Sequence, residues 1–232
     1  MRLQVGDIEV EVVYKDIKNL YLRVLPPDGR VVVSAPRRVG GATIANFVTA
    51  KLGWIRRKQR AMQEQRLREQ REGASGETLY VWGRRCRLTV VEGARYGMEV
   101  DGADALFTVR DGSTPEQRSA WLREWQREQL CEALERVLPV WEERTGLYPA
   151  QWRTKYMKTR WGTCNTRARR VWFNVRLAEY PPECLEYVVL HELAHLREPS
   201  HNADFKAILD AHMPNWRSVR RMLDDQAQGR LG

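Results

Sequence analysis

The histidines of this chain constrain its fold more than any other feature. Only four occur in 232 residues, and His191, His195 and His201 fall within eleven positions. Apolar residues precede the first two at helical spacing, and residues four apart on a helix lie on one face. Pro199 and Ser200 should end this helix and turn the chain back. The pattern therefore predicts a helix over His191 and His195, followed by a reversal that returns His201 to them.

Three imidazoles in this arrangement are typical of a catalytic zinc site. Neutral imidazole binds zinc at ~2.0–2.1 Å, and a catalytic site uses three protein ligands and leaves one position open. Glu192 follows the first histidine, so its carboxylate should lie beside the pair rather than between them, as in H-E-x-x-H helices. We predict that His191, His195 and His201 bind Zn²⁺, and that Glu192 is the base that activates a water there.

Two alternatives concern the histidines themselves. Histidines four apart on a helix can be ordinary surface or core residues, but the clustering of three out of four favours a metal site. The spacing equals that of metzincins, although Glu198 stands where that pattern has glycine. The turn should therefore be built differently, at Pro199-Ser200, and a true metzincin is not expected. His212, the fourth histidine, is interpreted as structural.

Composition limits the class of protein. No run of 18 apolar residues occurs, so no membrane span is expected. The N-terminus lacks the apolar stretch of a signal peptide, which predicts a cytoplasmic protein. The cysteines form no CxxC pair and are expected to be free thiols. They are Cys86, Cys131, Cys164 and Cys184.

The net charge of +9 permits contact with nucleic acid or another polyanion. Much of the excess lies in residues 51–71, which hold eight basic residues against Glu64 and Glu69. This segment is either a solvated helix face or a polyanion-binding stripe. Its basic residues are Lys51, Arg56, Arg57, Lys58, Arg60, Arg66, Arg68 and Arg71.

Periodicity predicts an α+β fold in two parts. Residues 1–112 should form a β-rich region, with a three-stranded meander before a long basic helix over 42–72. Gly73-Ala74-Ser75-Gly76 ends that helix and is a hinge candidate. Residues 113–232 should form the metal-binding catalytic domain. Its expected elements are a helix capped at Thr114 and running towards Glu143, strands over 151–158 and 170–177, the metal-binding helix opened by Pro181-Pro182, and short helices over Asp204–His212 and from Pro214.

Several segments outside the histidine cluster resemble a known family. They are Met157–Cys164 with its R-W-G-x-C sequence, Tyr187–Leu196, His201 with Phe205 four residues later, Val32–Pro36, and Phe47-Val48 with Lys51, Trp54 and Ile55. Together they resemble the YgjP-like metallopeptidases, relatives of the SprT-like zinc proteases, over about residues 18–226. The resemblance implies a zincin-like core, zinc held by the same three histidines, Glu192 as the base, and a peptide or protein substrate.

Three functional classes remain open on this basis. The first is a zinc peptidase. The second is a nucleotide pyrophosphatase acting on UTP, as one branch of the family is described, although no Gly-rich phosphate loop occurs here. The third is a DNA-associated protease that contacts nucleic acid through residues 51–71.

Further residues are candidates for the cleft. Arg160, Tyr156 and Asn174 are candidates to stabilise the oxyanion, or are ordinary strand residues. The strand over 171–176 can edge the cleft and pair with an extended peptide, or lie in the core. Trp161-Gly162 can form part of the cleft wall, whereas Cys164 is not expected to be a ligand.

Overall fold

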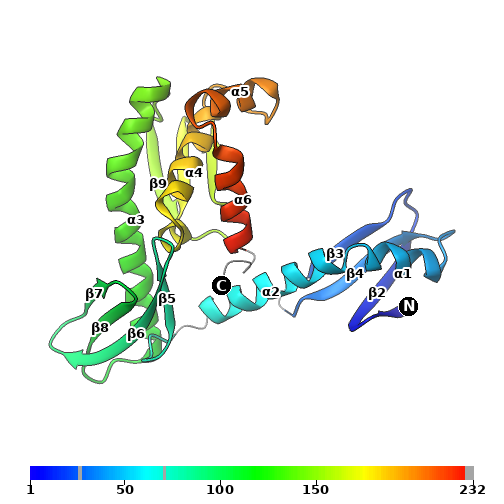
Figure 1. The fold of residues 1–232 in the computed structure, drawn as a ribbon, viewed down its shortest axis with the longest axis horizontal. Helices are drawn as coiled ribbons and strands as arrows, with labels where there is room; N and C mark the ends of the chain where they lie inside the picture. The colour runs from blue at the N-terminus through cyan, green and yellow to red at the C-terminus, as the bar shows by residue number, and fades with distance from the viewer. Residues whose placement is uncertain (26–27, 70–71, 228–232) are drawn as a thin grey trace. The chain divides into compact units, whose positions relative to one another are not determined.

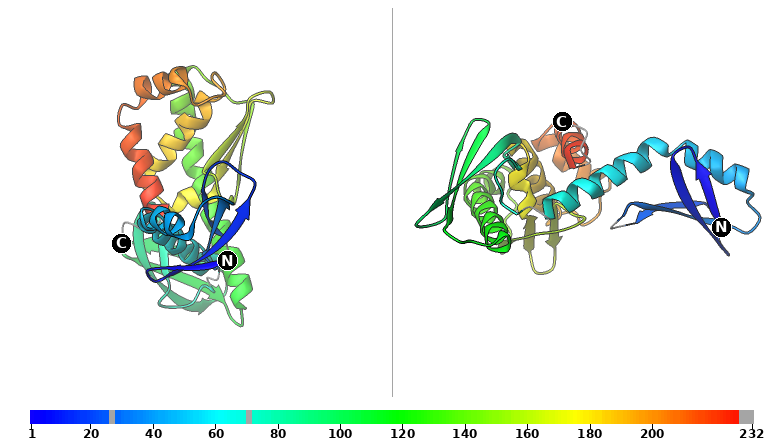
Figure 2. Two further views of the ribbon diagram at one scale, coloured as in Figure 1. Left: turned by 90° about the vertical axis from the view of Figure 1, so that its right-hand side faces the viewer. Right: turned by 90° about the horizontal axis from the view of Figure 1, so that it is seen from below.

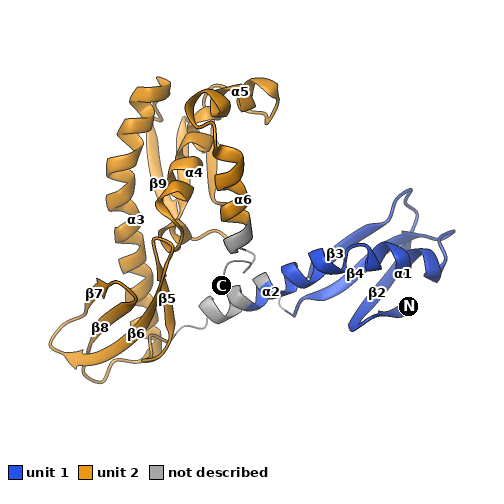
Figure 3. Cartoon of the chain, viewed as in Figure 1, with its two compact units in different colours: residues 1–70, 225–232 blue, residues 71–224 orange. Residues whose placement is uncertain are grey.

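The structure, a computed structural model, describes residues 1–25, 28–69 and 72–227 and has a mixed α+β architecture (Figure 1). It contains two compact units (Figure 3). Unit 1 comprises Met1–Gln70 and Asp225–Gly232, and unit 2 comprises Arg71–Asp224. The second β-sheet, within residues 78–110, therefore lies in unit 2 together with residues 113–224. The extent of the catalytic domain at 113–232 stays a prediction.

Unit 1 contains a four-stranded sheet of β1 (Arg2–Val5), β2 (Ile8–Lys15), β3 (Tyr21–Leu25) and β4 (Arg30–Pro36). The strand order is β1-β2-β4-β3, and β2 and β4 are parallel. The predicted meander is therefore wrong. β4 is the most continuously buried strand of this sheet, because it lies between β2 and β3 and pairs with both. Pro26-Pro27, between β3 and β4, favours a turn because proline fixes φ, but these two residues lie outside the described part of the chain.

Two helices pack on this sheet instead of the single helix predicted over 42–72. They are α1 (Gly41–Thr49) and α2 (Leu52–Glu69), with Ala50 as the C-cap of α1. Ile44, Val48 and Ile55 are buried in the core of the unit against the sheet valines. The basic face of α2 is partly neutralised, because Arg56 pairs with Asp7 at 2.7 Å. The predicted stripe extends to residues whose side chains are not described.

The second sheet and the longest helix begin unit 2. β5 (Thr78–Val81), β6 (Arg84–Gly93), β7 (Gly97–Asp101) and β8 (Asp104–Arg110) have the order β5-β6-β8-β7. α3 (Pro115–Thr145) starts with a capping box between Thr114 and Gln117, and it continues through Pro139. Gly73, part of the predicted hinge, has φ +65°, and a Cβ there would lie 3.2 Å from the Phe107 ring. That glycine is therefore packed against the core of this sheet.

The third sheet contains a strand that sequence periodicity missed. β9 (Gln151–Lys155), β10 (Gly162–Asn165) and β11 (Arg170–Asn174) have the order β10-β11-β9. The segment Gly162–Asn165 was expected to be a connection, because it is short and lacks apolar alternation. It forms an antiparallel pair with β11, so the strand over 171–176 is central and the two edges of the sheet are β10 and β9.

Four helical segments complete unit 2. They are the 3₁₀ segment η1 (Val175–Glu179), α4 (Pro182–Ala194), α5 (Ala203–His212) and α6 (Trp216–Ala227). α4 contacts α3, α5, β10 and β11, and it lies between α3 and α6 (Figures 1 and 2). In the described part of the chain, we find no helix with the length and apolar character needed to cross a membrane.

Candidate metal centre

α4 presents His191 and His195 because its other faces are buried. The helix begins after Pro181, with a proline at its first position, where no backbone N–H is needed. Leu185, Val189 and Leu193 are at most 1% exposed. The α-helix ends at Ala194, earlier than the expected stop at Pro199, and His195 is its C-cap in a right-handed helical conformation. Both histidines therefore extend from the last two turns of a helix fixed by its core contacts.

The reversal after α4 uses backbone and cap hydrogen bonds. The N–H groups of Arg197 and Glu198 both donate to the carbonyl of Ala194. The Glu198 carboxylate accepts from the N–H of Ser200 at 3.1 Å. Asn202 then caps α5, because its side chain accepts from the Phe205 N–H at 3.0 Å. These bonds place His201 immediately before a new helix and next to α4.

The three predicted ligands converge in the structure. Ligand nitrogens of His191, His195 and His201 all lie within 4.8 Å of one another. The Nε2 atoms of His191 and His201 are 3.1 Å apart. Two nitrogens bonded to one tetrahedral zinc at ~2.0–2.1 Å lie about 3.3 Å apart, so this spacing fits one shared ion.

The other ring nitrogens have their own contacts. Nδ1 of His195 lies 3.1 Å from the carbonyl oxygen of Glu198, which can only accept, so Nδ1 carries the proton and Nε2 is left as the ligand atom. Nδ1 of His191 faces the Tyr187 hydroxyl at 3.5 Å. Burial and the neighbouring histidines lower the pKa of His191 to about 3, so its ring is neutral at physiological pH. Neutral imidazole is the form that binds a metal ion.

Phe205 supports all three rings. It is 2% exposed, and its ring centroid lies 5.0 Å from that of His191, 4.7 Å from His195 and 4.8 Å from His201. The ring of His201 is perpendicular to it, an edge-to-face arrangement. One aromatic side chain from α5 therefore orients ligands from two segments.

Glu192 lies where a base would be useful. It is 4% exposed, and its Oε2 has no hydrogen-bond partner within the described part of the chain. Gly162 on β10 makes room for it, since a Cβ there would lie 2.5 Å from Oε1 and 2.6 Å from Cγ. Burial raises the pKa of Glu192 to about 8, and the Arg160 guanidinium opposes that rise. A buried, unpartnered carboxylate oxygen beside three converging imidazoles fits a metal ion with a water on it.

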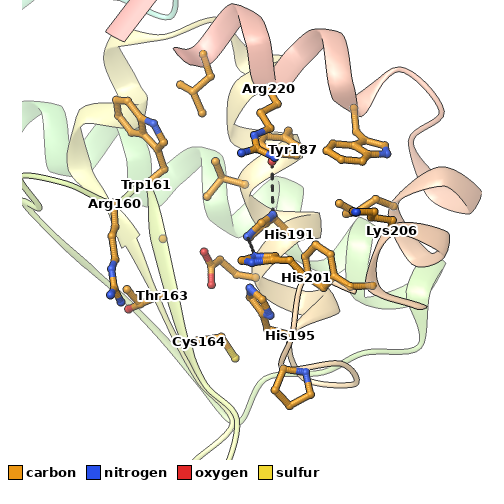
Figure 4. Close-up of a pocket in the computed structure, with 18 of the residues that line it drawn as sticks. Arg160, Trp161, Thr163, Cys164, Tyr187, His191, His195, His201, Lys206 and Arg220 are labelled. Atoms are coloured by element: carbon orange, nitrogen blue, oxygen red, sulfur yellow. Dashed lines mark hydrogen bonds between the residues drawn. The ribbon is translucent and has the colours of Figure 1, made fainter. Parts of the chain in front are cut away.

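The cluster opens into a pocket of about 820 Å³ (Figure 4). One wall comes from Arg160–Cys164 and the other from α4, α5 and α6. Sequence reasoning missed three of its lining residues, Lys206, Trp216 and Arg220, because nothing in the spacing of α5 and α6 relates them to the histidines.

Of the three residues predicted as oxyanion candidates, one lines the pocket and two do not. Arg160 lines the pocket. Tyr156 is not part of its lining, and its hydroxyl contacts Gln126 and the Arg123 carbonyl. The Asn174 amide donates to the carbonyls of Met157 and Arg160, so it holds the β9–β10 connection rather than facing the pocket.

Two further residues can be compared with their predicted roles. Cys164 lines the pocket but is not in the ligand cluster, and burial raises the pKa of its thiol to about 11. His212 ends α5 and is half-buried outside the pocket lining.

A helix carrying two imidazoles, a third imidazole after a reversal and a buried glutamate define a candidate metallohydrolase. The family model described as "YgjP-like, metallopeptidase domain" matches residues 18–226. The chain therefore belongs to the YgjP-like metallopeptidase family, as its sequence resemblance predicted.

Solved structures similar to this chain include two metallopeptidase zymogens. Abylysin of Pyrococcus abyssi is 19% identical with a TM-score of 0.37, and jannalysin of Methanocaldococcus jannaschii is 16% identical with a TM-score of 0.36. Each match covers 40% of this chain and 95% of the other. The search of curated proteins found no match.

Proposed function

We propose that this chain is a zinc-dependent metallopeptidase in which His191, His195 and His201 hold the ion and Glu192 is the general base. Membership of a metallopeptidase family supports the reaction class. The convergence of three imidazole ligand atoms within 4.8 Å is the observation that carries the metal site. Three nitrogen ligands with one position left for water or substrate are typical of catalytic zinc.

Zinc bound there would supply a Lewis acid that lowers the pKa of a water and polarises the substrate carbonyl. Glu192 takes the proton from the attacking water and later donates it to the leaving nitrogen. Its unpartnered Oε2 is free to accept the first hydrogen bond. Of the three residues considered from sequence for the oxyanion, only Arg160 lines the pocket, and its exposed guanidinium is available to bind a charged group of the substrate.

The β10 edge supports a peptide substrate. β10 pairs with β11 on one side, and Gly162, Thr163 and Cys164 line the pocket. An extended peptide can add to a sheet edge through main-chain hydrogen bonds, which bind it without regard to its side chains. Such a peptide would pass Glu192 directly, because Gly162 is in contact with that carboxylate.

The decisive experiment compares wild type with Glu192→Gln, each loaded with zinc and assayed on peptides, denatured protein and nucleoside triphosphates. We expect peptide cleavage to fall by about 10²–10⁴-fold with metal content unchanged. Glu186→Gln is the matched control, since Glu186 is on α4 but does not line the pocket. A wild-type protein that binds no stoichiometric metal, or a Glu192→Gln variant with full activity, would refute the proposal.

The two alternatives predict other results, the first in the same assay and the second in a separate measurement of DNA binding. A UTP pyrophosphatase would hydrolyse the nucleotide through the same zinc site and cleave no peptide. A DNA-associated protease would bind DNA in a salt-sensitive way through residues 51–71. Charge reversal at Arg56, Arg57 and Lys58 with unchanged DNA affinity would exclude that second alternative.

A further inference from the structure

The walls of the pocket carry cationic side chains from three separate segments. Arg160 precedes β10 on one wall, while Lys206 of α5 and Arg220 of α6 are on the other. Figure 4 shows Arg160 on one side of the histidines, and Lys206 and Arg220 on others. All three are exposed. The metal centre therefore lies between positive groups rather than beside one of them.

The charge of Arg160 is not neutralised locally. It forms no ion pair with any described carboxylate, and Glu192 is an acid of the same pocket on which its positive charge acts. The segment that contains it, residues 144–178, has no Asp or Glu. Its nine basic residues are Arg144, Arg153, Lys155, Lys158, Arg160, Arg167, Arg169, Arg170 and Arg176.

The opposite wall is also positive on balance. Lys206 has no ion pair with a carboxylate among the described residues. Arg220 pairs with Asp224 at 3.8 Å, a long contact between two exposed side chains. Apart from Glu192, Asp224 is the single acid that lines the pocket, against three basic residues. A dication on the histidines would add to this excess, and a cleft lined with one sign of charge concentrates oppositely charged ligands.

We propose that the pocket selects acidic peptides, with carboxylate side chains within about three residues on each side of the attacked bond. Arg160 binds the carboxylate on the β10 side, and Lys206, assisted by Arg220, binds the one on the side of α5 and α6. An extended chain advances about 3.3 Å per residue, so three residues on each side of the attacked bond span about 10 Å in each direction. This inference rests on the proposed peptidase function and names the substrate class of that site.

The test uses the full-length zinc-loaded protein and pairs of peptides that differ by Glu→Gln on one or both sides of the cleaved bond. An exposed ion pair contributes up to about fivefold, so kcat/KM should be up to about 25-fold higher for the peptide with both acids. The preference should fall as salt rises from about 50 to about 500 mM, because exposed charges are screened.

Variants assign the preference to each wall. Arg160→Gln and Lys206→Gln should each remove the response to one of the two acids, and Arg160→Glu should favour a lysine there instead. Arg167→Gln is the matched control, because Arg167 is exposed in the same acid-free segment but does not line the pocket. It should leave the preference unchanged.

A binding measurement separates recognition from chemistry. Fluorescence anisotropy of the labelled peptides with zinc-loaded Glu192→Gln should show the same order of affinities without cleavage. Equal kcat/KM for acidic and neutral peptides overturns this inference and leaves the peptidase intact. Loss of activity on every peptide in Arg160→Gln also overturns it, since Arg160 would then act on the reacting atoms. Cleavage of nucleoside triphosphates and of no peptide refutes the proposed function and this inference together.

Discussion

Gly162→Ala tests whether the position of Glu192 sets the rate. In the structure, an added Cβ at 162 would lie 2.5 Å from Glu192 Oε1, 2.6 Å from Cγ and 2.7 Å from Cδ. Carbon atoms pack at about 3.5–4.0 Å, so the carboxylate or β10 must move by about 1 Å. Neither is free to do so at low cost, because Glu192 is 4% exposed on a buried helix and β10 is paired with β11.

A misplacement of 1 Å at a reacting group can lower a rate by about 100-fold, which corresponds to about 2.7 kcal/mol in the barrier. We therefore expect kcat/KM for peptide cleavage to fall about 100-fold in Gly162→Ala. Zinc content should stay stoichiometric, because the added methyl group contacts Glu192 and not the histidines. Steady-state kinetics on one peptide, with metal analysis of the same sample, measures both quantities.

The matched control is Gly97→Ala, a strand glycine of the same unit whose added Cβ would have its nearest contact at 3.9 Å. It should keep wild-type activity. In a double-mutant cycle, Glu192→Asp should cost less activity in the Gly162→Ala background, since the shorter side chain relieves the contact. Full activity in Gly162→Ala with an unchanged fold would show that the carboxylate can move freely, and the argument from positioning would be wrong.

Three further substitutions test how the site is supported. Phe205→Ala should lower the free energy of unfolding in chelator by about 3–5 kcal/mol in a denaturant titration, and should weaken zinc affinity, because all three rings pack on Phe205. Thr114→Ala should lower the free energy of unfolding by about 1 kcal/mol through loss of the capping box, with peptidase activity unchanged. Hydrogen bonds from Arg217 and Trp216 lower the pKa of Asp210, so the stability it contributes is present above its unfolded pKa and is lost as pH falls through its folded pKa. Asp210→Asn should therefore reduce the melting temperature at pH 7, and in a series of thermal melts the reduction should shrink as the pH is lowered below the ordinary range of an aspartate.

The chemistry-bearing part of the site could be predicted because it is local. Helical spacing alone puts the two imidazoles of H-E-x-x-H on one face of the helix and the carboxylate beside them. The proline after the helix predicts a reversal of the chain. The bonds that place His201, from Asn202 and Glu198, are short-range as well. The family model agrees with the resemblance over residues 18–226. The identity of the bound metal and the role of each residue stay predictions until they are measured.

The parts that could not be predicted depend on long-range pairing. Strand order cannot be read from periodicity, so the parallel pairing of β2 with β4 was missed, and a meander was expected. β10 has only four residues and no apolar alternation, and it is a strand because β11 offers it a partner. Lys206 and Arg220 reach the pocket through the packing of α5 and α6, which no local pattern reveals.

The residues around the metal centre and the charged residues of the pocket walls differ in burial, and that difference determines which substitutions the site tolerates. Glu192 and Phe205 are at most 4% exposed, so substitutions there disturb packing as well as chemistry. Arg160, Lys206 and Arg220 are exposed, and substitutions at exposed positions usually change stability by less than about 0.5 kcal/mol. Substrate charge preference can therefore be altered with little effect on stability, whereas a substitution at Glu192 or Phe205 has to keep the shape of the side chain, as Glu192→Gln does, if the packing around the metal centre is to be preserved.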